Sequence, residues 1–554
     1  MGLNKHLYLS SLLLSIPLSF VSTSFAAQQV DLSHQKPAIL KSYISQATGL
    51  GFNEVSRHLD LNSMLHVRIK QTFQGHPVFG GDAILHIPHG NKTGPSLTQA
   101  IEDAANSGSM NGDVYLAIEK DVTGTPAFAL NQTQAQKAIK QAIQNHQDKT
   151  GSKGLVSNSK SSLLIYIDDK QKAHWAYQVN FDVAPSKLGQ LPAKPVYILD
   201  AVSLETYLNW DNIQTREVNA VEYGGGFGGN PKTGPFASMG KKVYDGLSGN
   251  MRRLRVTRDD ATKTCSMKNK VVTVKHYSGG SVPTFPCPTV DPQHNNVYWN
   301  GEFHKVNSGY SPDNDALIDG KIISDMYQKW YGVPVLIENG KPKMLTMVVH
   351  AYMDNAYWDG EKMTFGDGIS MFYPLTSLGV GAHEIGHGFT QQHSNLIYSG
   401  QSGGMNEAFS DMAAQGAEVF MYGVGKNSWQ IGPEIFKDQD EALRYMDKPS
   451  KDCNGGKPGN WCSIDDASQY FNGLDVHFSS GVYNRAYYTL GTTKGWDGKK
   501  AFDVMVKANM DYWTPNSTFV QGACGALKAA KDLGYSVEDV AAAFATVKVD
   551  TSSC

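Results

Sequence analysis

The stretch His383-Glu384-Ile385-Gly386-His387, followed twenty residues later by Glu407, carries the strongest signal in this 554-residue chain. Positions i and i+4 lie on one face of a helix, so His383 and His387 can direct their imidazoles at a single metal ion. Glu384 lies one residue further round the helix and can reach a metal-bound water without binding the metal itself. Two His and one Glu leave the fourth tetrahedral position open, which is typical of a catalytic rather than a structural zinc site.

The residues around this stretch fit the same interpretation. Asp411 lies four residues after Glu407, so both would project from one face of a second helix. An Asp at that place can accept the second N–H of a metal-binding histidine and orient its ring. Gly388 and the Gly- and Ser-rich segment 398–404 would let the chain turn back, so we expect the second helix to begin near Gly404. A surface helix that carries two His and a Glu by chance is the alternative, and it would explain none of these neighbours.

Residues 1–26 are typical of a signal peptide. A basic start with Lys5 precedes a mostly apolar stretch from Leu7 to Val21, and small residues lead to a cleavage site that we place after Ala26. The apolar stretch is too short and too interrupted by Ser to span a bilayer, and nothing like a stop-transfer segment follows it. A membrane anchor is therefore the weaker alternative. We expect an exported, secreted protein that is soluble once the leader is removed.

The six cysteines all lie after residue 260, and an even number in an exported protein indicates disulfides. Fifteen pairings are possible in principle. We favour the sequential pairing because it closes three short loops: Cys265–Cys287, Cys453–Cys462 and Cys524–Cys554. The chain has no Cys-x-x-Cys pair, which argues against a cysteine-bound metal, and its net charge of −3 gives no reason to expect nucleic acid as a partner.

The chain is too long for one core, and about three units are expected. Alternating apolar residues predict a β-hairpin region at about 60–105, and strands with one helix predict a second small α+β unit at about 130–207. The glycine cluster 224–229 indicates a linker or a processing junction. Every motif that carries chemistry comes after it, first in a Val- and Tyr-rich part that predicts sheet and then in an Ala- and Met-rich part that predicts helices.

Two later motifs are weaker when each is taken alone. Asp475 stands two residues before His477, and in an extended segment it would share a face with the His and could orient its ring. A lone histidine is more often structural, and Arg444 alone could be an ordinary surface residue.

Taken in order, however, these runs resemble the thermolysin family of zinc endopeptidases, and most closely its pseudolysin and vibriolysin branch. The resemblance extends from about residue 224 to the C-terminus. The matching runs are Asn355-Ala356-Tyr357-Trp358, His383 to His387, Tyr398, Asn406-Glu407-Ala408, Ser410-Asp411, Leu443-Arg444-Tyr445-Met446-Asp447 and Asp475-Val476-His477.

The resemblance implies a role for each matched residue. The zinc ligands would be His383, His387 and Glu407, with Glu384 as general base and Asp411 as the partner of a ligand. Tyr398 and His477 would hydrogen-bond the oxyanion, with Asp475 supporting His477. Arg444 would bind a substrate carbonyl, and Asn355 and Ala356 would hold the substrate backbone. The pocket for the residue after the cut would be lined by Phe372, Leu375, Val380 and Leu443. These four are apolar, so we expect cleavage before bulky apolar side chains, with simple core packing as the alternative.

The N-terminal half resembles the propeptide of the same family. Residues 27–215 would then assist folding, keep the enzyme latent and be removed autocatalytically, with a cut anywhere from Tyr207 to Glu222. The expected fold class is α+β. The two-module α+β propeptide would precede a β-rich catalytic N-lobe at 216–381 and an active-site helix with a helical C-lobe at 382–554. The expected partners are protein and peptide substrates and the propeptide itself, and we expect a monomer.

The sequence departs from the family at its usual calcium site. The matching positions hold Gly379, Gln415 and Ser428, with only Glu418 retained. Neutral ligands are poor replacements for carboxylates around a hard dication, so calcium is doubtful there.

Two other functions remain open from the residues alone. A metallo-aminopeptidase also uses two His and a distal Glu, but it needs an acidic anchor for the free amine of its substrate. A binding protein with a structural zinc site would have no use for a base or for oxyanion donors.

Overall fold

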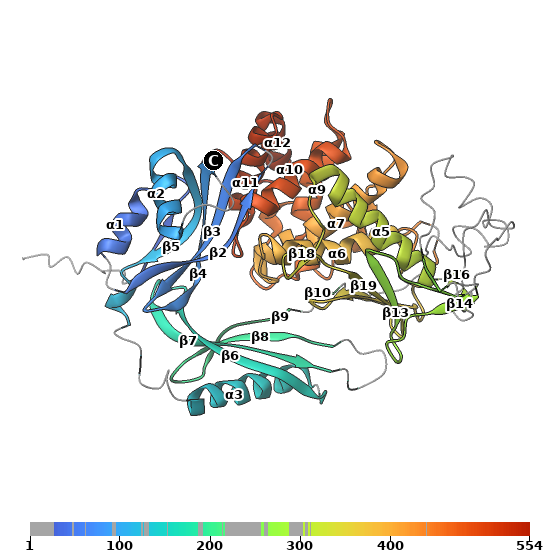
Figure 1. Ribbon diagram of the computed structural model, residues 1–554, viewed down its shortest axis with the longest axis horizontal. Coiled ribbons are helices and arrows are strands. Elements are labelled where there is room, and N and C mark those ends of the chain that lie inside the picture. Colours follow the sequence, from blue (N-terminus) through green and yellow to red (C-terminus); the bar gives the residue numbers. More distant parts are fainter. Residues whose placement is uncertain are drawn as a thin grey trace, which may run out of the picture.

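The computed structural model describes residues 27–554 except for 47–48, 61, 91–95, 123–125, 127–131, 152, 185, 187–191, 213, 216–255, 260–263, 287–302, 305–308, 311 and 439. The expected signal peptide, the glycine cluster 224–229 and Cys287 therefore lie outside the described residues. Figure 1 shows the N-terminal region in blue and teal beside the remainder of the chain, which runs from green to red.

The first part of the N-terminal region is a sheet with two helices. Its elements are β1 (Gln28–Asp31), α1 (Ile39–Gln46), β2 (Leu50–Leu59), β3 (Met64–Phe73), β4 (His76–Pro88), α2 (Leu97–Ser107) and β5 (Ser109–Leu116). Strands β3 and β4 form the hairpin expected at 60–105, with Phe73 opposite His76. The two turn residues, Gln74 and Gly75, have φ of 50° and 82°, as a tight turn that follows the twist of the strands requires.

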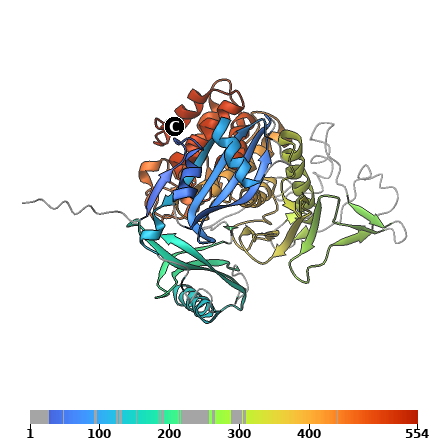
Figure 2. The same cartoon turned by 60° about the vertical axis from the view of Figure 1, so that its left-hand side comes forward.

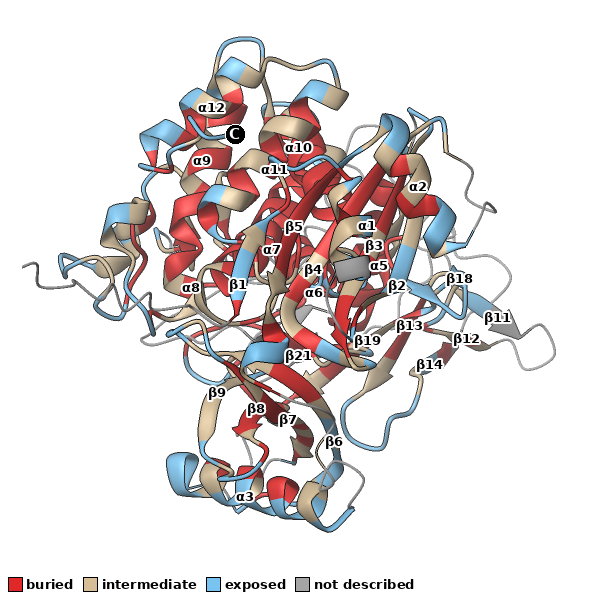
Figure 3. Cartoon of the chain, turned by 90° about the vertical axis from the view of Figure 1, so that its left-hand side faces the viewer, coloured by how far each residue is buried: buried red, intermediate tan, exposed pale blue. Residues whose placement is uncertain are grey.

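The second part packs a helix on the same sheet. Its elements are η1 (Ile118–Lys120), α3 (Gln132–Thr150), β6 (Val156–Ile167), β7 (Ala173–Val183), β8 (Pro195–Asp200) and β9 (Thr206–Asp211). Helix α3 buries Ala138, Ile139 and Ala142 and leaves its outer side exposed (Figure 3). Among the described residues, one path of strands, β1-β5-β4-β6-β7-β8-β9, joins both parts, and the link between them is the pair Val78 and Ile165.

The remainder of the chain has a β-rich lobe and a helical lobe, in agreement with the expected fold. The main sheet of the first lobe runs β10-β20-β21-β19-β13. Its strands and the neighbouring elements are β10 (Gln214–Thr215), β11 (Thr257–Asp259), β12 (Thr264–Ser266), β13 (Val272–His276), β14 (Thr284–Pro286), β15 (Phe303–His304), β16 (Gly309–Tyr310), α5 (Pro312–Tyr331), β17 (Ile337–Glu338), β18 (Lys341–Pro342), β19 (Leu345–Ala351), β20 (Ala356–Trp358) and β21 (Met363–Gly366).

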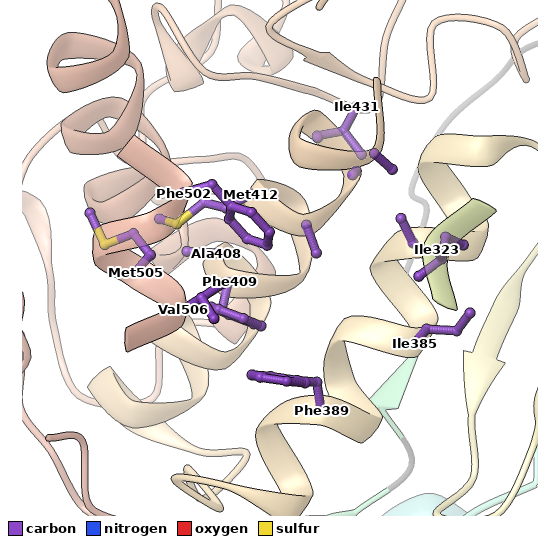
Figure 4. Close-up of a cluster of buried hydrophobic side chains, with 14 of the residues drawn as sticks. Ile323, Ile385, Phe389, Ala408, Phe409, Met412, Ile431, Phe502, Met505 and Val506 are labelled. Carbon is purple, nitrogen blue, oxygen red and sulfur yellow. The ribbon is translucent and has the colours of Figure 1, made fainter. Parts of the chain in front are cut away.

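The helical lobe is built around two long helices. The elements are α6 (Leu378–Gln392), α7 (Gly400–Tyr422), β22 (Gln430–Ile431), β23 (Arg444–Tyr445), η4 (Pro449–Cys453), η5 (Ala467–Gln469), α8 (Val476–Ser479), α9 (Gly481–Thr492), α10 (Gly498–Asp511), α11 (Phe519–Asp532) and α12 (Val537–Thr546). Figure 4 shows how α6 and α7 share a core, where Phe389 faces Phe409 and Phe502 of α10 packs beside them. The rings of Phe389 and Phe409 are stacked with their centroids 5.6 Å apart.

The expected start of the second helix near Gly404 is wrong, because α7 already begins at Gly400. Gly388 is likewise inside α6, and the chain turns only after His393. Gly388 and Gly404 serve close packing instead of a turn. A Cβ on Gly404 would overlap the hydroxyl of Ser479 and lie 3.1 Å from its carbonyl carbon, so only a glycine lets α8 lie directly on α7.

Two of the expected disulfides are present, Cys453–Cys462 and Cys524–Cys554. Cys265 is also disulfide-bonded, but its expected partner Cys287 lies outside the described residues. Within the part of the chain that the structure describes, no helix is long and apolar enough to cross a bilayer.

The N-terminal region lies against the helical lobe, and Figure 2 shows its blue strands crossing the red and orange helices. Arg68 of β3 reaches the C-terminal end of α10. Its guanidinium donates to the carbonyl oxygens of Trp513 at 2.7 Å, Met510 at 2.6 Å and Asn509 at 3.2 Å. The last carbonyls of a helix lack partners within the helix, so a cation there is favourable. Arg68 thus joins the two regions through backbone atoms.

We expect Gly404→Ala to lower the free energy of unfolding by about 1–3 kcal/mol, because the added methyl group must push α8 away from α7. Urea unfolding of the full chain would measure this. The matched control is Gly379→Ala in α6, where the nearest atom to the new Cβ is 4.0 Å away. It should raise stability by up to ~1 kcal/mol, because Ala favours the helix. Equal effects of the two substitutions would refute the packing argument.

Candidate active site

Helices α6 and α7 bring together the three predicted zinc ligands. His383 Nε2 and His387 Nε2 lie 3.0 Å apart, and Glu407 oxygens lie 3.5 Å from the first and 3.3 Å from the second. All three side chains are buried. Zinc–nitrogen bonds of about 2.0–2.1 Å in a tetrahedron place neighbouring ligand atoms roughly 3.3 Å apart. The spacing and the chemistry of this donor set therefore fit one zinc ion.

Each histidine is oriented through its other ring nitrogen. His383 Nδ1 lies 2.9 Å from an oxygen of Asp411, as the i+4 spacing from Glu407 predicts. His387 Nδ1 lies 2.8 Å from Oδ1 of Asn406, whose amide nitrogen donates to the Leu396 carbonyl at 3.0 Å. Both Nε2 atoms are thereby directed toward the same point. Asn406 was not predicted to have a role, although its place directly before Glu407 could have suggested one.

Asp411 is the centre of a buried polar network. It accepts two hydrogen bonds of 2.6 Å from Arg444 and one of 2.8 Å from the Asn484 amide. Burial alone would raise the pKa of Asp411, but the charge of Arg444 and the hydrogen bonds from Arg444 and His383 hold it well below its usual range. Asp411 is therefore charged. Asn484 comes from α9, and no local pattern in the sequence marked it.

Tyr398 and His477 lie next to the metal-ligand set. The Tyr398 hydroxyl donates to Glu407 and lies 3.2 Å from His477 Nε2. The expectation that Asp475 and His477 share one face of an extended segment is wrong. Asp475 instead caps α8, and its Oδ1 accepts from the His477 backbone N–H at 2.8 Å and lies 2.7 Å from the ring Nδ1. Burial lowers the pKa of His477, but the charge of Glu407 and the Asp475 hydrogen bond outweigh it, so the pKa is raised.

Glu384 lies within this buried set and is not exposed at all. Its charge helps to raise the pKa of both His387 and Tyr398, although burial and Glu407 have larger effects on each.

The four residues expected to line a specificity pocket are well buried. Phe372, Leu375 and Val380 are not exposed, and Leu443 packs against the same core. The ring of Phe372 meets that of Phe436 edge-on with the centroids 5.1 Å apart. Such burial is compatible with core packing as well as with a pocket wall.

Asn355 directly precedes β20, and Ala356 is the first residue of that strand. Strand β10, which consists of Gln214 and Thr215, is hydrogen-bonded to β20, with Gln214 opposite Trp358. The N-terminal region therefore adds a strand to this sheet next to Asn355 and Ala356.

A cleft of about 720 Å³ opens beside Tyr398 and His477. Its opposite wall is formed by the end of the N-terminal region, including Leu208, Trp210 and Asp211. Access to this side of the site therefore passes along the N-terminal region.

Three of the four positions of the usual calcium site, Gln415, Glu418 and Ser428, are connected by hydrogen bonds. Ser428 donates from its backbone N–H at 2.5 Å and from its hydroxyl at 3.0 Å to Glu418. Gln415 accepts from the Trp429 N–H at 2.7 Å. Burial, together with the charge of Glu434, raises the pKa of Glu418 to about 8. The protein's own donors thus surround the one retained carboxyl group.

Two lobes with a buried His–His–Glu set and an adjacent carboxylate define the class of zinc metallopeptidases. Comparison with known families agrees with this class. The description "Thermolysin metallopeptidase, catalytic domain" matches residues 239–391, and "Thermolysin metallopeptidase, alpha-helical domain" matches 394–549. The "Fungalysin/Thermolysin Propeptide Motif" matches residues 51–92.

Relatives of known class match almost the whole chain. A zinc metalloproteinase of Legionella pneumophila is 43% identical over 580 residues, covering 100% of this chain and 99% of its own. The zinc metalloproteinase MspA of Legionella longbeachae is 44% identical over 571 residues and 100% of both chains. The hemagglutinin/proteinase of Vibrio cholerae is 38% identical over 540 residues, or 95% of this chain and 79% of that protein. The chain belongs to the thermolysin family, on its vibriolysin side, and is a zinc metalloendopeptidase with a propeptide.

We expect Asp411→Asn to lower the free energy of unfolding by about 3–5 kcal/mol, because the buried Arg444 would lose its closest counter-charge and keep only Glu407, at 3.4 Å. Denaturant unfolding of the full chain would measure the loss. The matched control is Asp447→Asn, which breaks an exposed ion pair with Lys451 and should cost less than ~1 kcal/mol. A loss at Asp411 as small as that of the control would show that the network contributes little to stability.

Proposed function

We propose that His383, His387 and Glu407 bind the catalytic zinc ion and that Glu384 is the general base. The observation that carries this proposal is the convergence of three buried ligand atoms at 3.0–3.5 Å beside a fully buried fourth group, Glu384. Asp411 and Asn406 fix the orientation of the two imidazoles. We further propose that the enzyme is secreted after loss of residues 1–26.

Zinc, when bound, lowers the pKa of its water to about 7 and polarises the scissile carbonyl. Glu384 takes the proton of the attacking water and returns it to the leaving amine. Tyr398 and His477 donate hydrogen bonds to the oxygen on which negative charge develops, and their 3.2 Å separation lets both reach one atom. Asp475 keeps the His477 ring in place and favours its charged form. The reaction needs no Ser or Cys nucleophile.

The substrate chain would bind along β20 as β10 does, with Asn355 and Ala356 holding its backbone. Arg444, which lies 3.4 Å from the proposed ligand Glu407 and is paired with Asp411, would bind a substrate carbonyl. A strand that runs through the site favours cleavage within a chain over removal of a single N-terminal residue. We propose that Phe372, Leu375, Val380 and Leu443 select bulky apolar side chains on the carboxyl side of the cut.

The N-terminal region would keep the enzyme latent by covering the site. Residues 208–211 form one wall of the cleft at Tyr398 and His477, and β10 pairs with β20, where substrate would bind. A cut at 207–211 would divide β9 within its sheet, so processing after Thr215 fits the architecture better. The hydrogen bonds around Glu418 support a loop that is held without calcium.

We expect Glu384→Gln to lower peptide hydrolysis by at least 10²–10⁴-fold, because the isosteric amide cannot accept the proton of the water. The variant should keep its zinc and remain near full length. Metal content, casein cleavage and the mass of the purified chain would be measured together. The matched control is Glu361→Gln at an exposed position, which should behave as wild type.

Normal processing and activity in the Glu384 variant would exclude this residue as the base. Sequencing of the product N-termini from the wild-type digest tests the specificity in the same experiment. Bulky apolar residues should dominate those new N-termini. New N-termini that occur in proportion to the residues of the substrate would contradict the proposed specificity pocket. That result would not affect the assignment of Glu384 as the base.

We expect Arg68→Ala to weaken binding of the cleaved propeptide to the rest of the protein, because three hydrogen bonds from a charged group are lost. The binding free energy should fall by at least ~2 kcal/mol, which raises the dissociation constant about 30-fold. Activity should then appear sooner after processing, as a time course of casein cleavage would show. Lys70→Ala is the control, since Lys70 pairs with Asp82 inside the same sheet. Identical time courses for the two variants would show that Arg68 does not contribute to latency.

A further inference from the structure

A second group of potential metal ligands lies in the β-rich lobe, apart from the zinc site. His276 ends β13, Asp313 is in the first turn of α5, and His350 is in β19. One ligand atom from each of the three lies within 4.8 Å of the others. His276 Nε2 is 3.2 Å from one oxygen of Asp313, and His350 Nε2 is 4.0 Å from the other. The activity assigned to the protein makes no use of this group.

The donor atoms suit a transition metal. Two imidazole nitrogens and one carboxylate oxygen are the usual protein ligands of zinc and its neighbours. The 3.2 Å between His276 and Asp313 is close to the roughly 3.3 Å expected between two ligands of a tetrahedral ion. Asp313 is almost fully buried, while the side chains of His276 and His350 are 35% and 18% exposed. Water can therefore complete the coordination from one side.

A fourth residue orients one of these ligands. Asp367 follows β21, and its Oδ1 lies 2.8 Å from Nδ1 of His350. The opposite ring nitrogen then points to Asp313. The same arrangement holds His383 in the zinc site, where Asp411 lies 2.9 Å from Nδ1. A carboxylate behind a metal-binding histidine is the common partner that fixes the ring and makes it a better ligand.

The backbone at His350 is shaped to bring its side chain to this group. His276 pairs with Val349 in the parallel register of β13 and β19, so the residue after Val349 would ordinarily point to the other face of the sheet. His350 instead has φ of 64°, and the register with β21 shifts between Val348 and Ala351. Irregularities of this kind re-aim side chains and are concentrated at functional sites, because a non-glycine residue adopts them only at a cost.

The other groups of this type among the described residues are already explained. In one, Cys453 and Cys462 are joined to each other in a disulfide. In another, made of Asp60, His66 and Asp511, the ammonium group of Lys507 lies 2.6 Å from Asp60 and 2.9 Å from Asp511. Lys507 occupies the place that a metal ion would need.

We propose that His276, Asp313 and His350 bind a second divalent transition-metal ion of the zinc class, with Asp367 as a positioning residue. The ion would fasten the start of α5 to two parallel strands of the sheet. Its role is therefore structural, and it does not depend on which residues carry out catalysis.

The test is the metal content of the purified protein after equilibration with zinc and removal of unbound metal. Wild type should hold about two zinc ions per chain, and Asp313→Asn about one. The matched control is Asp325→Asn, the same substitution further along α5 at a residue paired with Lys321, and it should keep both ions. Asp367→Asn should weaken the second ion about 10- to 100-fold and leave the first unchanged.

Two further measurements test the proposal even if the Asp313 variant fails to fold. His276→Ala changes the most exposed ligand and should lose the second ion with its proteolytic activity retained. In wild type, zinc should protect His276 and His350 from carbethoxylation by diethyl pyrocarbonate, read by mass spectrometry. One zinc ion per chain in wild type at excess zinc would overturn the proposal. A second ion that survives both Asp313→Asn and His276→Ala would overturn it as well.

Discussion

The catalytic site depends on how closely α6 and α7 can approach. Three ligand atoms from the two helices must come within 3.0–3.5 Å of one another, and large side chains at the contact would prevent this. Gly386 provides the space, because a Cβ there would lie 3.0 Å from the Cα of Ser410 and 3.4 Å from the Cβ of Ala413. Gly404 likewise allows close packing at the contact between α7 and α8, and α8 carries His477. Small residues at the helix contacts thus set the positions of the chemical groups.

Close packing also buries charge, and the network around Asp411 compensates for it. Asp411 and Glu407 are both buried carboxylates, and Arg444 contacts both, at 2.6 Å and 3.4 Å respectively. An isolated buried charge is costly, whereas one that is paired and hydrogen-bonded can be kept. The residues that orient the proposed zinc ligands therefore also compensate the buried charges of the site. The stability of the helical lobe and the geometry of the active site therefore depend on the same network.

The N-terminal region uses backbone recognition at two of its contacts with the rest of the chain. Arg68 binds carbonyl oxygens at the end of α10, and β10 pairs with the backbone of β20. On the partner's side, contacts of this kind depend little on side-chain identity, so they need only a correctly folded partner. A region that binds folded backbone can therefore support the fold and cover the site at the same time.

The sequence by itself determined the structural relations between residues that lie only a few positions apart. The i and i+4 spacing of His383 and His387, the step from Glu407 to Asp411 and the hairpin around Gly75 are all present, because helix and turn geometry fixes them locally. The family motifs extended this to the fold and to the set of residues that meet at the site. The tertiary structure decided what depends on contacts between distant segments. The helical state of residues 400–404, the capping of α8 by Asp475, the Asn484 hydrogen bond and the meeting of His276, Asp313 and His350 all belong to this group. Such contacts join residues up to 74 positions apart in the sequence, and neither periodicity nor spacing carries information about partners so far away.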